Sequence, residues 1–155
     1  MKLPNRVLIL PNIRSCHNVG AMFRTADACG FDKLYLVGYT PHPPKPQIDK
    51  VSLGAETWIP WEASDSLESI IATLRDLRYQ IIALEKTAKS TSIKEFYPEK
   101  NVALIVGNEV EGVLADTLRL CDAVVHIPMV GKKESLNVSI AAGIAMYTLA
   151  EKMME

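Results

Sequence analysis

The sequence lacks the residue patterns that hold metals or disulfides. Cys16, Cys29 and Cys121 are the three cysteines, an odd number without C-x-x-C spacing, which argues against a disulfide framework and a zinc site. The three histidines have no metal-ligand spacing either, and we expect His126, at the end of a predicted strand, to be structural. We therefore predict that the protein binds no metal.

Long apolar segments are also missing. The first apolar run, 7–10, is too short for the apolar region of a signal peptide, and Pro11 closes it. The most apolar predicted helix segment, 138–150, is too short to cross a bilayer. We expect a cytoplasmic protein that does not associate with membranes.

Two phosphate-binding glycine patterns are absent. No G-x-G-x-x-G follows any predicted strand, and no Walker sequence is present. Gly107 and Gly112 do not have the spacing of the dinucleotide fingerprint. The sequence therefore argues against an NAD- or ATP-binding protein of the Rossmann type.

Charge of one sign is not in excess, since the formal net charge is −1. Nucleic-acid-binding proteins usually carry a basic patch, so this value does not by itself suggest one. Net charge does not report how charges are distributed, however. Five cations fall in or near the segments discussed below: Arg6, Arg14, Arg24, Lys132 and Lys133.

Strand-like and helix-like segments alternate along the 155 residues, which we expect to form a single domain without an added RNA-binding domain. Continuous apolar runs are typical of strands buried on both faces. The predicted strands are 6–10, 33–37, 57–61, 80–84, 101–106 and 124–127, and the predicted helices are 18–30, 47–53, 66–77, 115–121 and 137–154. This alternation predicts an α/β fold with a mostly parallel sheet and helices on both faces.

The last predicted helix is apolar or small on nearly every side before Glu151. A surface helix should show one polar face, so this helix is expected to be buried on two sides. A second copy of the chain would supply the second side, and we predict a homodimer.

The stretch from His126 to Ile144 has the layout of a ligand site. Pro128 and Gly131 end the preceding strand in a turn, and a helix begins again near Ser135 or Asn137, either of which can cap it. A bend between a strand and a helix leaves backbone groups open to a small molecule. A plain strand-to-helix connection has the same pattern, so this stretch alone does not decide between the two readings.

Two further segments favour a ligand site over a plain connection. They are Asn-Val-Gly-Ala-Met-Phe-Arg at 18–24 and Gly-Asn-Glu-Val-Glu-Gly at 107–112. With Ile-Pro-Met at 127–129 and Ser-Leu-Asn-Val-Ser at 135–139, they resemble the three ordered motifs of the SpoU (TrmH-like) branch of the SPOUT RNA ribose 2′-O-methyltransferases. The resemblance implies a SPOUT fold with a deep C-terminal trefoil knot, S-adenosyl-L-methionine as cofactor, and RNA as substrate.

The resemblance also assigns residues to roles. The cofactor would be held by the loops that contain Leu84, Gly107, Ile127, Met129 and Leu136. The catalytic set would be Arg24, Asn18, Glu109, Ser135 and Asn137, although simple helix capping also explains the last two. Position in the sequence, rather than the resemblance, makes Arg6, Arg14, Lys132 and Lys133 candidates for RNA contacts, since they fall in or near these segments. Trp58 and Trp61 could either stack on bases or pack at the rim of the core.

Arg24 is the residue on which we expect catalysis to depend. A guanidinium is effectively never neutral in proteins, so it is a poor candidate for the base that removes the 2′-hydroxyl proton. Gripping an RNA phosphate and stabilising charge on the ribose oxygen suits it better.

The target RNA stays open, with tRNA favoured over rRNA. One alternative function is a non-catalytic RNA-binding or assembly factor that kept the fold. Another is a small-molecule enzyme on a related α/β fold.

Overall fold

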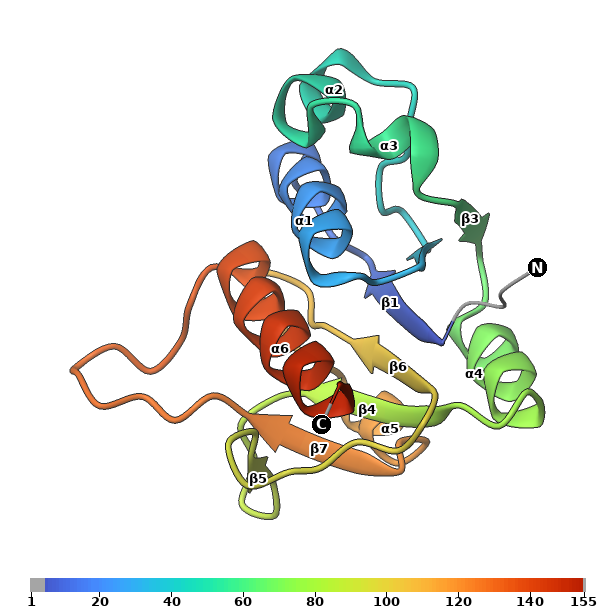
Figure 1. The fold of residues 1–155 in the computed structure, drawn as a ribbon. Helices are drawn as coiled ribbons and strands as arrows, with labels where there is room; N and C mark the ends of the chain where they lie inside the picture. Colours follow the sequence, from blue (N-terminus) through green and yellow to red (C-terminus); the bar gives the residue numbers. More distant parts are fainter. Residues whose placement is uncertain (1–4, 155) are drawn as a thin grey trace.

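The continuous apolar runs of the sequence form one sheet in the computed structural model, which describes residues 5–154 (Figure 1). Its strands are β1 (Arg6–Pro11), β2 (Lys33–Val37), β3 (Trp61–Ser64), β4 (Gln80–Leu84), β5 (Thr91–Ser92), β6 (Val102–Ile105) and β7 (Ala123–His126). Their order is β3-β2-β1-β6-β4-β7-β5, and every pair within the described residues is parallel. The predicted parallel α/β architecture is confirmed.

Helices cover both faces of the sheet, because successive side chains of a strand point to opposite sides. On β1, Leu8 and Leu10 belong to the core that α1 (Cys16–Cys29) and α6 (Val138–Met153) complete. Val7 and Ile9 belong to the core on the other face, under α4 (Leu67–Asp76). The other helices are α2 (Pro46–Ser52), α3 (Ala55–Trp58) and α5 (Ala115–Leu118). Figure 1 shows α1 and α6 side by side, and the two helices pack against each other.

Side-chain caps fix where the two long helices begin. Ser15 accepts a hydrogen bond from the Asn18 N–H at 3.1 Å, so α1 begins at Cys16, two residues before the predicted start. Asn137 caps α6 by accepting from the Ser139 N–H at 2.8 Å. Of the two candidate caps for this helix, Asn137 is therefore the one used. Asn137 lies within the motif segment 135–139, and Ser15 lies three residues before the motif segment 18–24.

The structure differs from the sequence prediction in two places. Residues 57–61 do not form a strand, because the chain makes the single turn α3 first and pairs with β2 only from Trp61 onward. Pro60 has no N–H to give to a sheet and immediately precedes this strand, β3, at the edge of the sheet. The polar stretch after β4, where no strand was predicted, contains β5, which pairs with the end of β7.

The carboxyl ends of parallel strands lie along one edge of the sheet, where ligands of α/β proteins bind. The loops that follow β4, β6 and β7 all start at this edge. In the described part of the chain, no helix has both the length and the apolarity required to cross a bilayer. The trefoil knot stays a prediction.

Candidate functional site

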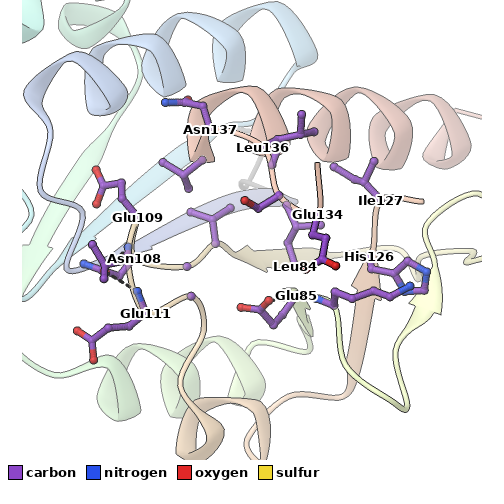
Figure 2. A pocket seen from close by; sticks show the side chains of 18 of the residues that line it. Leu84, Glu85, Asn108, Glu109, Glu111, His126, Ile127, Glu134, Leu136 and Asn137 are labelled. Atoms are coloured by element: carbon purple, nitrogen blue, oxygen red, sulfur yellow. Dashed lines mark hydrogen bonds between the residues drawn. The ribbon is translucent and has the colours of Figure 1, made fainter. Parts of the chain in front are cut away.

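A pocket of about 820 Å³ lies where the loops after β4, β6 and β7 meet (Figure 2). This volume is in the range of sites for small organic ligands. All five residues that the sequence assigned to cofactor binding line it: Leu84, Gly107, Ile127, Met129 and Leu136. Glu109, Ser135, Asn137 and Lys133 line it as well. Segments more than fifty residues apart in the sequence thus surround one cavity.

Glycine at position 107 is required by the space around it. A Cβ there would lie 2.5 Å from the backbone carbon of Gly112 and 2.7 Å from the backbone nitrogen of Val113. The loop closes on itself through Asn108, whose N–H donates to the Gly112 carbonyl at 3.2 Å and whose carbonyl accepts from the Gly112 N–H at 3.0 Å. Main chain, rather than side chain, therefore forms this wall of the pocket.

A chain of hydrogen bonds joins the three motifs. The carboxylate of Glu109 accepts from the N–H of Arg14 at 2.9 Å, from the N–H of Ser15 at 3.1 Å and from Nδ2 of Asn18 at 2.9 Å. Oδ1 of Asn18 then accepts from Nδ2 of Asn137 at 3.2 Å, an assignment that satisfies both amides. Glu109 of the second motif thus holds Asn18 and the loop before α1. Figure 2 places Glu109 and Asn137 on one side of the pocket and Glu85 and His126 on the other.

The same bonds set the ionisation of Glu109. Partial burial by itself would raise the pKa of this carboxyl, but the donors from Arg14, Asn18 and Ser15 outweigh it and hold the pKa below its ordinary value. The group is thus ionised at neutral pH, and its charge strengthens each bond that it accepts.

The predicted cations do not form one cluster. Lys133 lines the pocket and Arg14 lies beside it, held through its backbone by Glu109. Lys132 is the exposed neighbour of Lys133. Arg6 is elsewhere, because it is at the amino end of β1 and its Nη1 donates to the Gly30 carbonyl at 3.1 Å. The expectation that Arg6 lies near the pocket is wrong.

Arg24 is exposed on α1 and does not line the pocket of its own chain. It follows Asn18 by six residues, which is roughly 9 Å along a helix axis. Asn18, by contrast, is 5% exposed and lies inside the hydrogen-bond chain described above. One chain alone therefore brings four of the five candidate catalytic residues together.

Sequence reasoning missed three polar residues of the site. Glu85 accepts from the N–H of Val113 at 2.8 Å, and Asn108 accepts from the N–H groups of Val110 and Glu111 at 2.8 and 2.9 Å. His126, expected to be structural, does bond Ser90 Oγ through Nδ1 at 2.8 Å, but it also lines the pocket. Each of the three lies at, or one or three residues beyond, the end of a strand that borders the pocket, which is the signal that would have identified them.

Charges of both signs surround the cavity, with four glutamates, two lysines and His126 among its lining residues. Among the described residues, no group of three or more His, Cys, Asp or Glu is placed to hold a metal ion. The arrangement offers backbone groups, apolar side chains and a few charges. Those features suit an organic ligand that is partly apolar and partly charged.

Comparison with known proteins identifies the family of this chain. The model of the SpoU rRNA Methylase family matches residues 5–147. This chain belongs to that family. It is 32% identical over 142 residues to the tRNA (guanosine(18)-2'-O)-methyltransferase of Aquifex aeolicus, covering 91% of this chain and 66% of that protein.

Two solved structures of the family show the same fold. The AdoMet-bound rRNA methyltransferase of Sinorhizobium meliloti superimposes with a TM-score of 0.88 at 30% identity, covering 99% of this chain and 58% of that one. The TrmH/SpoU tRNA modifying enzyme of A. aeolicus does so with a TM-score of 0.88 at 27% identity, over 99% and 77%. The chain spans between 58% and 66% of the length of the first curated relatives that it matches.

Proposed function

We propose that this protein is an S-adenosyl-L-methionine-dependent methyltransferase that acts on a ribose 2′-hydroxyl of RNA, with tRNA favoured over rRNA, in the cytoplasm. The observation that carries the proposal is that the second and third motifs line one pocket and that hydrogen bonds join the first motif to both, because Asn18 donates to Glu109 and accepts from Asn137. Membership of the family supports the reaction.

The residues of the pocket fit this cofactor. The wall at Gly107 has no room for a side chain, so the main chain can lie against a flat base there and offer its own hydrogen-bonding groups. We assign cofactor binding to Leu84, Gly107, Ile127, Met129 and Leu136. When bound, the cofactor supplies an electrophilic methyl on a sulfonium, and the work left to the protein is mostly alignment.

Within this proposal, Glu109 holds the loop of Gly107 against the start of α1, and Asn18 and Asn137 fix the start of α6. Ser135 is exposed at the pocket and free of the capping role that Asn137 fulfils. We assign Ser135 and Asn137 to orienting the cofactor and the substrate ribose. Arg14, Lys132 and Lys133 are the candidates for RNA phosphate contacts on this side of the molecule.

Arg24 enters the proposal through a homodimer. The outer side of α6 carries Ile140, Ile144 and Tyr147, which are 55%, 40% and 64% exposed and lie one helical turn apart. Such a stripe is costly in water, and a second copy of α6 would cover it with a matching stripe. Because α1 packs beside α6, dimerisation through α6 brings the partner's α1 close to this chain's pocket edge. The guanidinium would there grip a substrate phosphate and stabilise charge on the ribose oxygen.

The decisive experiment is methyl transfer from tritium-labelled S-adenosylmethionine to bulk RNA taken from cells that lack this gene. We expect incorporation into one nucleotide, and nucleoside mapping by mass spectrometry should find it as a 2′-O-methyl nucleoside. RNA from cells that carry the gene is the control, since its site is already modified and should accept little label. Label in a base rather than a ribose would refute the proposed reaction.

Calorimetry with S-adenosylmethionine separates the enzyme from a non-catalytic assembly factor. We expect saturable binding. Absence of binding at millimolar cofactor, together with measurable RNA binding, would favour the assembly factor.

A further inference from the structure

Tyr39 is an aromatic residue that the fold leaves exposed next to the pocket. It is the second residue after β2, and 60% of its side chain is accessible to solvent. Its hydroxyl accepts a hydrogen bond from Nδ2 of Asn108 at 3.0 Å, and Asn108 lines the pocket. The ring is therefore at the same sheet edge as the proposed cofactor site, and its hydroxyl is bonded to a residue that lines that site.

The backbone around Tyr39 is fixed rather than loose. Its N–H donates to Oδ1 of Asn12 at 3.1 Å, and Gly38 before it has φ +67° with no room for a Cβ. Thr40 after it is 4% exposed, and its Oγ1 accepts from the Ile13 N–H at 2.9 Å while lying 2.7 Å from the Leu10 carbonyl oxygen. The turn after β2 is thus joined to the turn after β1, and the ring is presented in one place.

A rigid, exposed ring beside the pocket suits a nucleobase. The base of a nucleotide is attached to the ribose carbon adjacent to the one that bears the 2′-hydroxyl, so a ribose at the pocket holds its base only a few ångströms away. With the Tyr39 hydroxyl already bonded to Asn108, the ring offers its faces. Every base has a π-face, which makes stacking tolerant of sequence.

Other exposed or half-exposed aromatics fit this role less well. Trp58 is 59% exposed, but its Nε1 donates to the carboxylate of Asp27 at 2.8 Å, and an acidic neighbour repels RNA. Trp61 is half-buried and already stacked on His42, with ring centroids 5.3 Å apart. Of the two roles left open for these tryptophans, Trp61 takes the one at the rim of the core.

We propose that the ring of Tyr39 stacks on the base of the nucleotide that is methylated. This inference rests on the proposed function, because it requires a ribose at the mouth of the pocket. It adds a binding contact that none of the three motifs contains.

The test compares Tyr39→Ala, which removes the ring, with Tyr39→Phe, which keeps it and loses only the hydroxyl. Asn108 keeps its bond to the Asn12 carbonyl at 2.7 Å in both variants, so the pocket wall stays anchored. Tyr97→Ala is the matched control: Tyr97 is 67% exposed, with its ring under Lys152 near the far end of α6. The readouts are the KM for bulk RNA from cells lacking the gene, the Kd for S-adenosylmethionine, and filter binding of the same RNA.

We expect Tyr39→Ala to raise the KM for RNA by roughly 5- to 150-fold, the range for one stacked base, with the cofactor Kd within about twofold of wild type. Tyr39→Phe and Tyr97→Ala should match wild type. Wild-type KM in Tyr39→Ala would overturn the inference, as would equal damage in Tyr39→Phe or a parallel loss of cofactor binding. If the wild-type protein transfers no methyl, the proposed function fails, and filter binding then tests the Tyr39 contact separately. Weaker RNA binding by Tyr39→Ala than by the wild-type protein supports the contact. Equal RNA binding by the two proteins, or no binding by either, refutes it.

Discussion

Replacing Gly107 by alanine tests whether main chain forms the cofactor wall. The added Cβ would lie 2.5 Å from the Gly112 carbon, and ordinary contact begins at 3.4 Å. The two sides of the loop must therefore separate by roughly 0.9 Å, because both conflicting groups are backbone and neither can turn aside. The same movement lengthens the two bonds between Asn108 and Gly112, which are 3.0 and 3.2 Å long.

The expected cost has two parts. Overfilling a packed site typically destabilises a protein by about 1–3 kcal/mol, which for a chain of this length lowers the Tm by roughly 2–12 °C. A displacement of nearly 1 Å at a ligand-contacting backbone should weaken S-adenosylmethionine binding at least ~10-fold. The loss of affinity should exceed what partial unfolding explains at 25 °C.

Gly131→Ala is the matched control. Gly131 lies between the two segments of the third motif, and a Cβ there meets no atom within 4 Å. Neither glycine has a positive φ, so alanine strains the backbone at neither site. Replacing a glycine also lowers the conformational entropy of the unfolded chain, and this stabilising effect is the same in both variants. Differential scanning fluorimetry and calorimetry with S-adenosylmethionine should show a change only in Gly107→Ala. Equal cofactor Kd values for the two variants, within about twofold, would refute the structural reasoning.

Three other changes have defined outcomes. Arg24→Ala should abolish methyl transfer to RNA and leave the cofactor Kd nearly unchanged, and persistent turnover would disprove its catalytic assignment. Glu109→Gln should lower the Tm at pH 7, since the native pKa of Glu109 is held low and its ionised form is the stabilising one. As pH falls below about 4.5 the wild-type advantage should disappear; a difference that persists in acid would mean that charge is not the cause. Ile144→Glu should convert a dimer into a monomer in analytical ultracentrifugation, and an unchanged sedimentation coefficient would place the interface elsewhere.

Much of this molecule follows from local sequence patterns. The runs that became β1, β2, β4, β6 and β7 are continuous and apolar, and such runs have few alternatives to a buried parallel strand. The five cofactor candidates all line the pocket because each is in or beside a loop at a carboxyl strand end, a position that strand assignment fixes. The early start of α1 and the turn α3 were missed because several neighbouring residues can cap or turn the chain, and residue type alone does not select among them. The strand β5 was missed because a two-residue strand depends on pairing with the distant β7.

The sequence by itself determined the succession of strands and helices along the chain and the set of loops that reach one sheet edge, since both depend on residue type and spacing. Tertiary structure alone decided which side chains meet there. Glu109 reaches Asn18 across 91 positions and Asn137 reaches Asn18 across 119, while Arg6 and Arg24 point to other parts of the surface. Such pairings depend on the order of the strands within the sheet and on helix packing, which bring together residues that no local pattern connects.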